Sequence, residues 1–569
     1  GYGLYVSSFG EVLLTNILAG NNVNQGLFIN NADAVSTAGI TLAVLGDGIW
    51  NDIFENGNGG MTLNSNGNIA LNYVKAFDNG GVGADISNRE SLFAAIVSIT
   101  HGQFYGNEAE GLKVISKGDI VWKFGGAWEN DLIGAYLSNY TSGGFGSVTV
   151  QGSTKERMSF DENGWDGVDK DGLFVESRGK ITLGYILANH NNGFGVQLSN
   201  ENALSNQPVS ITEIDVNMNE KSGLEVRSKG GITLKGIQST GNKLYGAMLS
   251  NNSGKGNVSV TTTTGRKENS LGDNGTTGLY IRSAGNVSLK NISAFNNVER
   301  GIDVDNTYGT GGVTYQSSGS IFVVANNGQE GLSIVSKGNV NITNQYGLVA
   351  VENGSYGIFI TNDFPYRSKY VNLTNVLAVA NPSTGIYVKA SGYIYATSLT
   401  AQANDQEGVK LVTSSAPITV TGSNLVSGNG FDGLYATSVQ GKISISNVVA
   451  SSNTLNGIHA VSTTGNISIT GSTANDNHQN GMLLNSIGNF YLKNARASGN
   501  GKDDAGQDLD DGLNITAGDY SVVTIIDSTF MNNWFGSGIE IKRPNPDRLP
   551  LLTRVNYLSN GEKNLWVHD

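Results

Sequence analysis

The sequence predicts an all-β solenoid in which short strands stack coil upon coil, and three observations predict it. First, a phrase of glycine, apolar residue, any residue and apolar residue begins 21 times between Gly3 and Gly538, with a mean period of about 27 residues. Second, apolar residues two apart lie on one face of a strand. Third, Gly, Asn and Ser separate the apolar segments, and no segment repeats apolar residues at the helical period. We therefore expect almost no helix.

Each period contains more than one strand. After the phrase at residues 172–175, Ile181 and Leu183 alternate with polar residues, which predicts a second strand. A third short element ends in Ala-x-x-Asn, as at Ala76 to Asn79. We expect two or three strands of about 3–5 residues in each coil, joined by turns.

One coil cannot bury its own apolar residues, but a stack of coils can, because each strand then pairs with its copies in the neighbouring coils. A β-propeller would need longer periods and four antiparallel strands in each blade. Parallel connections are right-handed by default. The predicted fold is therefore a right-handed parallel β-helix of about 21 coils, which at roughly 4.8 Å a coil makes a rod on the order of 100 Å long.

A two-coil period divides the chain. The fifth residue after the glycine alternates between Ser and Asn over fourteen coils, from Ser8 to Asn362. We predict two-coil repeats over residues 1–384, mostly single-coil repeats over 385–542, continuous with the first part, and a cap or docking tail over 543–569, where we find no repeat. The Ser and Asn side chains are expected to satisfy turn backbone groups and to stack as ladders.

The composition limits the classes of function. The chain has 569 residues, a net charge of -13, 15% charged residues and no cysteine. Disulfides, thiolate zinc sites and cysteine nucleophiles are therefore excluded, and a nucleic-acid partner is disfavoured because the chain is acidic. No apolar run approaches the ~18 residues of a membrane span. Many small polar residues with few charges are typical of a secreted protein, so we predict an extracellular or cell-surface location.

The repeats resemble those of a known group of proteins. GLFVESRGKITL at residues 172–183 and YGAMLSN at residues 245–251 are similar to the tandem repeats of very large β-helix surface proteins of bacteria. The resemblance covers about residues 1–540. It implies an extracellular structural or adhesive role, as in a surface filament, a sheath or an adhesin shaft, and it supplies no catalytic residues.

Parallel β-helices also include polysaccharide lyases and hydrolases, so we looked for a pair of carboxylates on adjacent coils. Polysaccharide hydrolysis needs two carboxylates across the scissile bond. Outward-facing acids are scarce: Glu225 and Asp303 lie three coils apart, and Asp85 and Glu540 are isolated. We predict no catalytic residues, and a lyase or hydrolase remains an alternative.

Two acidic segments precede coil-starting glycines. Oxygen-rich, glycine-bearing loops suit calcium, and no other cofactor is expected. The alternative is a solvated acidic turn. The candidate calcium ligands are Asp161, Asp166, Asp169, Asp171, Asp503, Asp508, Asp510 and Asp511.

Aromatic residues are enriched at the outward position between the two apolar ones. Such a row could bind a polysaccharide or a protein partner, which makes a carbohydrate-binding β-helix an alternative function. Stabilisation of the sheet by stacked rings is the other explanation. The row consists of Tyr5, Phe28, Tyr136, Phe174, Tyr280, Phe359, Tyr387 and Tyr435.

The two ends of the predicted stack point to self-association. The first phrase starts at Gly3 with no capping helix before it, and residues 549–566 contain several apolar side chains. Uncapped coils can pair with another chain. We therefore expect end-to-end or lateral self-association, and head-to-tail contacts of this kind build filaments.

Overall fold

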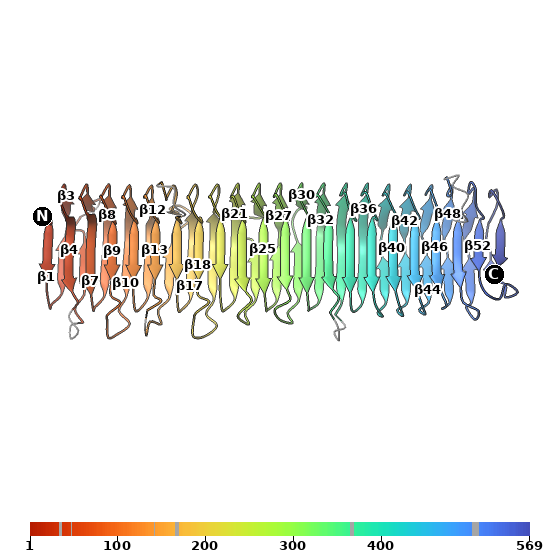
Figure 1. The fold of residues 1–569 in the computed structure, drawn as a ribbon, viewed down its shortest axis with the longest axis horizontal. Coiled ribbons are helices and arrows are strands. Elements are labelled where there is room, and N and C mark those ends of the chain that lie inside the picture. Colours follow the sequence, from red (N-terminus) through yellow and green to blue (C-terminus); the bar gives the residue numbers. More distant parts are fainter. Residues whose placement is uncertain (33–36, 47, 142, 166–169, 365–368, 503–510) are drawn as a thin grey trace. The chain divides into compact units, whose positions relative to one another are not determined.

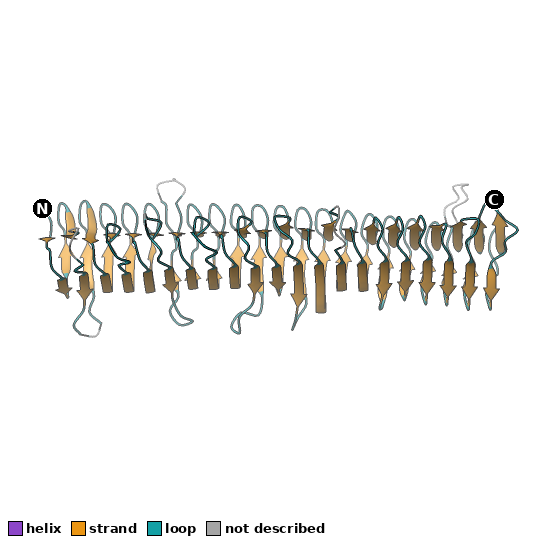
Figure 2. Ribbon diagram, turned by 90° about the horizontal axis from the view of Figure 1, so that it is seen from below, coloured by secondary structure: helices purple, strands orange, loops and turns teal. Residues whose placement is uncertain are grey.

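The computed structural model describes residues 1–32, 37–46, 48–141, 143–165, 170–364, 369–502 and 511–569. It divides into two compact units, Gly1–Ser288 (unit 1) and Leu289–Asp569 (unit 2), and the division falls within β26 (Val287–Lys290). Figures 1 and 2 show that each unit consists of short strands joined by turns. The described residues contain no helix, as the sequence predicts.

In unit 1 the glycine phrases form one parallel stack. Each strand is paired in register with its copy one coil on, for example Leu173 with Val196. The strands of this stack are β1 (Leu4–Ser7), β4 (Gln25–Asn31), β7 (Gly59–Ser65), β9 (Ala84–Ser87), β11 (Leu112–Ile115), β13 (Ala135–Ser138), β16 (Leu173–Glu176), β18 (Val196–Ser199), β20 (Leu224–Arg227), β22 (Ala247–Asn251) and β25 (Leu279–Ser283).

The remaining strands of unit 1 complete the coils and are also parallel to their copies. They are β2 (Val12–Thr15), β3 (Leu18–Gly20), β5 (Ile40–Ala43), β6 (Asn51–Phe54), β8 (Ile69–Phe77), β10 (Val97–Tyr105), β12 (Ile120–Trp128), β14 (Val148–Gln151), β15 (Met158–Ser159), β17 (Ile181–Leu187), β19 (Val209–Asp215), β21 (Ile232–Thr240), β23 (Val258–Thr261) and β24 (Asn269–Gly272).

Unit 2 repeats this arrangement. The corresponding stack contains β28 (Ile302–Asn306), β31 (Leu332–Ser336), β33 (Ile358–Asn362), β35 (Ile386–Ala390), β37 (Val409–Thr413), β40 (Leu434–Ser438), β43 (Ile458–Ser462), β46 (Met482–Ser486), β49 (Leu513–Ala517), β52 (Ile539–Lys542) and β54 (Leu565–His568).

The other strands of unit 2 are β27 (Ile292–Phe295), β29 (Val313–Ser317), β30 (Phe322–Ala325), β32 (Val340–Val351), β34 (Val371–Val379), β36 (Ile394–Gln402), β38 (Ile418–Thr421), β39 (Asn424–Ser427), β41 (Ile443–Ser446), β42 (Val448–Ser451), β44 (Ile467–Thr470), β45 (Thr473–Asn475), β47 (Phe490–Lys493), β48 (Arg496–Ser498), β50 (Val523–Ile526), β51 (Thr529–Met531) and β53 (Leu551–Thr553).

The apolar residues of the phrases form the core. Leu173 and Val175 of β16 have no exposed surface. In β40, Leu434 is 1% exposed and Ala436 has no exposed surface. Phe174, between the first two, faces outward. Full burial of an aliphatic side chain contributes about 1.5–3 kcal/mol, and the contribution recurs in every coil. The predicted stacking is confirmed in both units.

The second and third strands of many coils join without a loop, which makes them longer than the predicted strands. β8, β10 and β12 have nine residues each. Each turns a corner at a left-handed residue, Tyr73 (φ 52°), His101 (φ 53°) or Phe124 (φ 62°), and in β12 the following Gly125 (φ 106°) also has a positive φ. Sequence patterns suggested a turn here because alternation breaks at the corner, yet one left-handed residue is enough to change direction.

A continuous ladder of buried asparagines connects the coils of each unit. In unit 1, Nδ2 of Asn191 donates to Oδ1 of Asn219, and Nδ2 of Asn219 donates to Oδ1 of Asn242, at 3.0 and 2.9 Å. The ladder of unit 1 contains Asn22, Asn56, Asn79, Asn107, Asn130, Asn163, Asn191, Asn219, Asn242 and Asn274. That of unit 2 contains Asn297, Asn327, Asn353, Asn381, Asn404, Asn429, Asn453, Asn477, Asn500, Asn533 and Asn560.

This ladder lies at the Ala-x-x-Asn element, whereas we predicted ladders at the strand-end Ser and Asn. The strand-end residues do satisfy turn backbone groups, as predicted. Ser65 Oγ accepts a bond from the N–H of Gly67 at 2.9 Å, and Asn200 Nδ2 donates to the carbonyl of Gln207 at 2.8 Å. The two kinds of position therefore have different roles: one closes a turn within a coil, and the other joins successive coils.

The ladder explains the glycine that starts each phrase. A Cβ at Gly195 would lie 2.7 Å from Asn219 Nδ2 and 2.7 Å from the carbonyl oxygen of Gly223 in the next coil. Gly433 is enclosed in the same way by Asn453 and Gly457. Neither glycine has a positive φ, so lack of space, and not backbone conformation, requires glycine here.

Residues 543–569, expected as a cap or docking tail without a repeat, contain one further coil. β53 pairs with β50, and β54 pairs with β52 in register, with Leu565 beside Ile539. The phrase is present as Leu565-Trp-Val567, but Asn564 occupies the position of the glycine. Sequence reasoning missed this coil because it searched for the glycine.

Candidate functional sites

All eight residues of the predicted aromatic row lie at the outward middle position of their strands, but the row is interrupted. Tyr5 stacks on Phe28 with ring centroids 5.2 Å apart. Thr62, Asp85 and Lys113 occupy this position in the next three coils, before Tyr136. The other neighbouring pairs of the row are Tyr136 with Phe174, at 5.3 Å and tilted, and Phe359 with Tyr387, at 5.3 Å and stacked.

The two remaining residues of the row contact other rings. Tyr280 stacks on Tyr245 at 5.5 Å, and Tyr435 lies edge-on to His459 at 4.8 Å. A sugar ring stacks on the flat face of an aromatic ring. In a stacked pair the two facing surfaces are already covered, which fits the role of stabilising the sheet better than that of a continuous sugar platform.

A second aromatic ladder, which sequence reasoning missed, lies on another face of unit 1. Phe54, Phe77, Tyr105 and Trp128 stack on consecutive coils with centroid distances of 5.3, 5.1 and 5.0 Å and interplanar angles of 12° or less. Each is followed two residues later by an asparagine of the ladder, so aromatic-x-Asn in four successive repeats is the sequence signal.

This aromatic ladder ends at Trp128. In the next coil the corresponding residue is Asp161, whose carbonyl accepts a bond from the N–H of Glu129 at 3.1 Å. One face of the Trp128 ring is covered by Tyr105, and on the other side lies a hollow of about 290 Å³ lined by Trp128, Glu129, Ser159, Asp161 and Glu162. The last ring of the ladder therefore borders open space.

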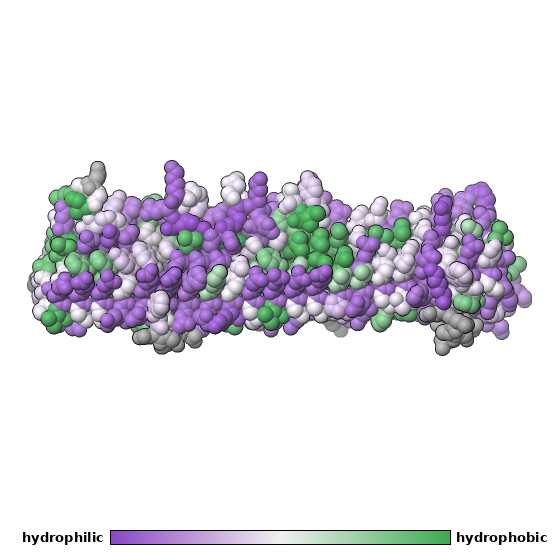
Figure 3. All heavy atoms as spheres, turned by 90° about the horizontal axis from the view of Figure 1, so that it is seen from above, coloured by the Kyte–Doolittle hydropathy of each residue, from purple (hydrophilic) through white to green (hydrophobic). Residues whose placement is uncertain are grey.

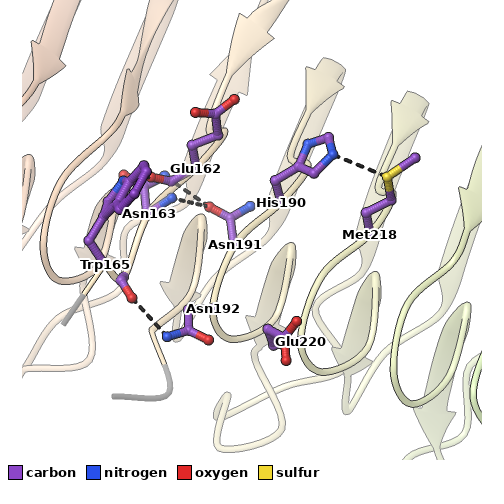
Figure 4. A pocket seen from close by; sticks show the side chains of 9 residues that line it. Glu162, Asn163, Trp165, His190, Asn191, Asn192, Met218 and Glu220 are labelled. Carbon is purple, nitrogen blue, oxygen red and sulfur yellow. Dashed lines mark hydrogen bonds between the residues drawn. The ribbon is translucent and has the colours of Figure 1, made fainter. Parts of the chain in front are cut away.

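A second hollow, of about 430 Å³, adjoins the first at Glu162. Figure 4 shows Glu162, His190 and Met218 in a row on successive coils, with Trp165 beside Glu162. The Trp165 side chain is 70% exposed and Met218 is 56% exposed. The hollow thus has two large exposed apolar side chains and several polar ones, a combination typical of small-ligand sites.

The side chains around this second hollow are held in place by hydrogen bonds. Trp165 Nε1 donates to the carbonyl of Glu162 at 3.0 Å, and Asn192 Nδ2 donates to the carbonyl of Gly164 at 2.9 Å. His190 Nε2 lies 3.1 Å from Met218 Sδ. The exposed indole is therefore fixed by the chain around it and does not depend on a ligand for its position.

The three predicted calcium ligands that lie among the described residues hydrogen-bond to the following coil. Asp161 Oδ1 accepts bonds from the N–H and Nδ2 of Asn189 at 2.7 and 3.0 Å, and Asp171 Oδ1 accepts from the N–H of Phe194 at 3.0 Å. Asp511 makes similar contacts, described below. The other five, Asp166, Asp169, Asp503, Asp508 and Asp510, lie outside the described residues. No group of three or more metal-ligating side chains occurs in the part of the chain that the structure describes.

Unit 2 carries a polar cluster on the outward face of its glycine-phrase strands. Glu540, expected to be isolated, is not: Asn514 Nδ2 donates to Glu540 Oε2 and also, at 2.8 Å, to Asp511 Oδ2. His568 Nε2 lies 2.9 Å from Glu540 Oε1, and the N–H of Ser537 donates to Asp511 at 2.6 Å. Sequence reasoning missed Asp511 because this residue precedes the glycine, whereas acid pairs were expected only at the middle position of each phrase.

Burial governs the charge of this cluster. Asp511 is 4% and Glu540 1% exposed. Desolvation raises the pKa of Asp511 to about 8, and a hydrogen bond to Glu540 and its negative charge act in the same direction. Asp511 therefore holds its proton near neutral pH.

A related contact lies on the strands before this cluster. His459, the second residue of β43, has its Nδ1 2.9 Å from Asp432 Oδ2. Asn456 donates to the other oxygen of Asp432 at 2.8 Å. Polar side chains of neighbouring coils thus bind one another along this face of unit 2.

Comparison with known proteins agrees with this architecture. Residues 384–545 match the family model described as right handed beta helix region. No curated protein and no solved structure matches the chain. Together with the parallel register of the strands, the match defines the fold class as a right-handed parallel β-helix. In the described part of the chain, no helix has the length and apolar character needed to cross a bilayer.

Proposed function

We propose that the chain is a non-catalytic, extracellular structural or adhesive β-helix that forms part of a cell-surface filament, a sheath or an adhesin shaft. The observation that carries this proposal is the asparagine ladder, which joins successive coils within each unit through hydrogen bonds of 2.8–3.1 Å that are buried except at its ends. A stack whose every step is fixed by the same buried contact suits a shaft, because each coil supports the next.

The pair of Asp511 and Glu540 in unit 2 is the feature that favours an enzymatic function. The geometry of this pair, however, disfavours that function. Retaining and inverting glycosidases need their carboxyl groups roughly 5 Å or more apart so that a sugar or water fits between them. One amide group bridges Asp511 and Glu540, and both are almost fully buried. A polysaccharide could not reach this pair, so a role in joining the coils is the better explanation.

An apolar patch supports lateral self-association. The outward residues Val323, Val349 and Leu377 lie side by side on β30, β32 and β34. Ile321 (57% exposed) directly precedes β30, and Tyr346 (55% exposed) lies within β32. Figure 3 shows a patch of apolar side chains on this part of unit 2. A contiguous exposed apolar patch is typical of an interaction surface.

Three kinds of measurement test the proposal. Sedimentation velocity and negative-stain electron microscopy of the purified chain should show concentration-dependent association into fibres or bundles, whereas monodisperse single particles at the highest soluble concentration would contradict it. Incubation with neutral and acidic polysaccharides should release no reducing ends or unsaturated products, and reproducible product release would establish the enzyme alternative. Surface labelling of cells that express the full-length protein tests the location.

A further inference from the structure

The two adjoining hollows of unit 1 have the features of a carbohydrate site. We propose that they bind an uncharged or amino-substituted polysaccharide, with sugar rings stacked on Trp128 and Trp165. This inference gives the adhesive role a ligand, and in that sense it rests on the proposed function. It is separate from the predicted aromatic row, none of whose members lines either hollow.

The indole surfaces supply the apolar part of the site. Trp165 is 70% exposed yet held by its hydrogen bond to the Glu162 carbonyl, and Trp128 borders its hollow with the ring face that Tyr105 does not cover. A fixed, exposed aromatic face is a platform for the C–H face of a pyranose ring, because little conformational entropy is lost when the ligand binds.

The polar groups around the hollows select the charge of the ligand. Glu129 and Glu162 are exposed, and within the described residues their carboxylates have no hydrogen-bond or ion-pair partner. Glu220 forms an ion pair with Lys243, and Asp161 is bonded to Asn189. The polar side chains that remain available to a ligand are thus mostly negatively charged hydrogen-bond acceptors. They suit hydroxyl and ammonium donors and repel uronic acids and sulfated sugars.

The size and position of the site favour a chain over a single sugar. The hollows measure about 290 and 430 Å³, and Glu162 lines both. The row of Glu162, His190 and Met218 borders the larger hollow over three successive coils (Figure 4). A polysaccharide lying across the coils can contact both tryptophans, whereas a monosaccharide can contact one.

Isothermal titration calorimetry with the full chain tests the proposal. The probes are hexamers of β-1,4-linked glucose, of β-1,4-linked glucosamine and, as an acidic comparison, of galacturonic acid. We expect at least one of the first two to bind and the acidic hexamer not to bind. Trp165→Ala and Trp128→Phe should each weaken binding at least tenfold, and Glu162→Gln should weaken glucosamine binding more than glucose binding.

Trp534→Ala is the matched control, because Trp534 is 63% exposed and belongs to unit 2. It should leave binding unchanged, and all variants should keep the thermal unfolding midpoint of the parent, since Trp165 is exposed and Phe preserves the stack at position 128. Binding that survives Trp165→Ala, binding of the acidic hexamer alone, or no binding of any probe would overturn the inference. None of these results would bear on self-association, so failure of the site and failure of the structural role can be distinguished.

Discussion

Replacement of one ladder asparagine by alanine tests whether the ladder holds the stack together. Asn219 is 1% exposed. Its Nδ2 donates to the Ala188 carbonyl at 3.0 Å and to Asn242 Oδ1 at 2.9 Å, and its Oδ1 accepts from the N–H and Nδ2 of Asn191 at 3.0 Å each. Asn219→Ala therefore removes four hydrogen bonds inside unit 1.

The magnitude follows from the groups left behind. Asn191 Nδ2 keeps its bond to the Phe160 carbonyl, and Asn242 Oδ1 keeps the N–H of residue 219. The N–H of Asn191 and the carbonyl of Ala188 lose these partners in a buried setting. At about 1–3 kcal/mol for each of these two unsatisfied buried groups, the free energy of unfolding should fall by about 2–6 kcal/mol.

Urea denaturation followed by far-ultraviolet circular dichroism measures this loss, with Asn257→Ala as the control. Asn257 is exposed and accepts one bond, from the N–H of Asn286 at 2.9 Å, so its replacement should cost about 1 kcal/mol or less. Hydrogen exchange at residue 191 should accelerate in the first variant. If the two variants shift the midpoint equally, the ladder does not stabilise the stack as argued.

Three further predictions concern packing, pH and association. Gly195→Ala should destabilise unit 1 by several kcal/mol, because its Cβ would meet backbone and ladder atoms at 2.7–2.8 Å, while Gly10→Ala, with the nearest atom 3.9 Å away, should change the unfolding midpoint little. The folded-state pKa of Asp511, raised to about 8, exceeds its unfolded value near 4, so stability should fall as pH rises from about 4 to 8. Asp511→Asn should flatten this decline in midpoints measured at pH 5 and 9, and an unchanged slope would refute the raised pKa of Asp511. Ile321→Lys should shift sedimentation toward the monomer, and unaltered association would exclude the apolar patch as the contact.

The strands and core could be predicted from the sequence because stacking gives every coil the same geometric problem. Leu173 and Val175 recur as apolar positions two apart in each phrase, so the pattern itself reports the buried face. The asparagine ladder was only partly recognised. In most coils the ladder asparagine lies four residues before the glycine, as Asn219 does before Gly223, and this spacing was a readable signal.

The candidate sites were harder to predict, since they depend on interruptions of the repeat. Gly172 follows the ladder asparagine Asn163 by nine positions in the sequence, and Trp165 lies beside side chains of the following coils. Nothing in the period of the repeat indicates where an inserted residue will lie. The acid pair was missed for a related reason: Asp511 and Asn514 are close in the chain, but Glu540 comes from the next coil.

One backbone constraint connects the scaffold to the proposed binding site. The residue before a ladder asparagine has a left-handed backbone, as in Glu162 (φ 58°), His190 (φ 57°) and Met218 (φ 54°). This conformation costs roughly 1–2 kcal/mol for an L residue, and glycine avoids the cost, as at Gly241 in the following coil. The ladder therefore fixes a row of outward side chains at one-coil spacing, whatever their identity. Most coils carry a residue other than glycine at this position, Ala380 and Ser452 among them, so the strain belongs to the scaffold as a whole. The case for ligand binding at Glu162, His190 and Met218 therefore rests on the exposed Trp165 and the hollow that they line together.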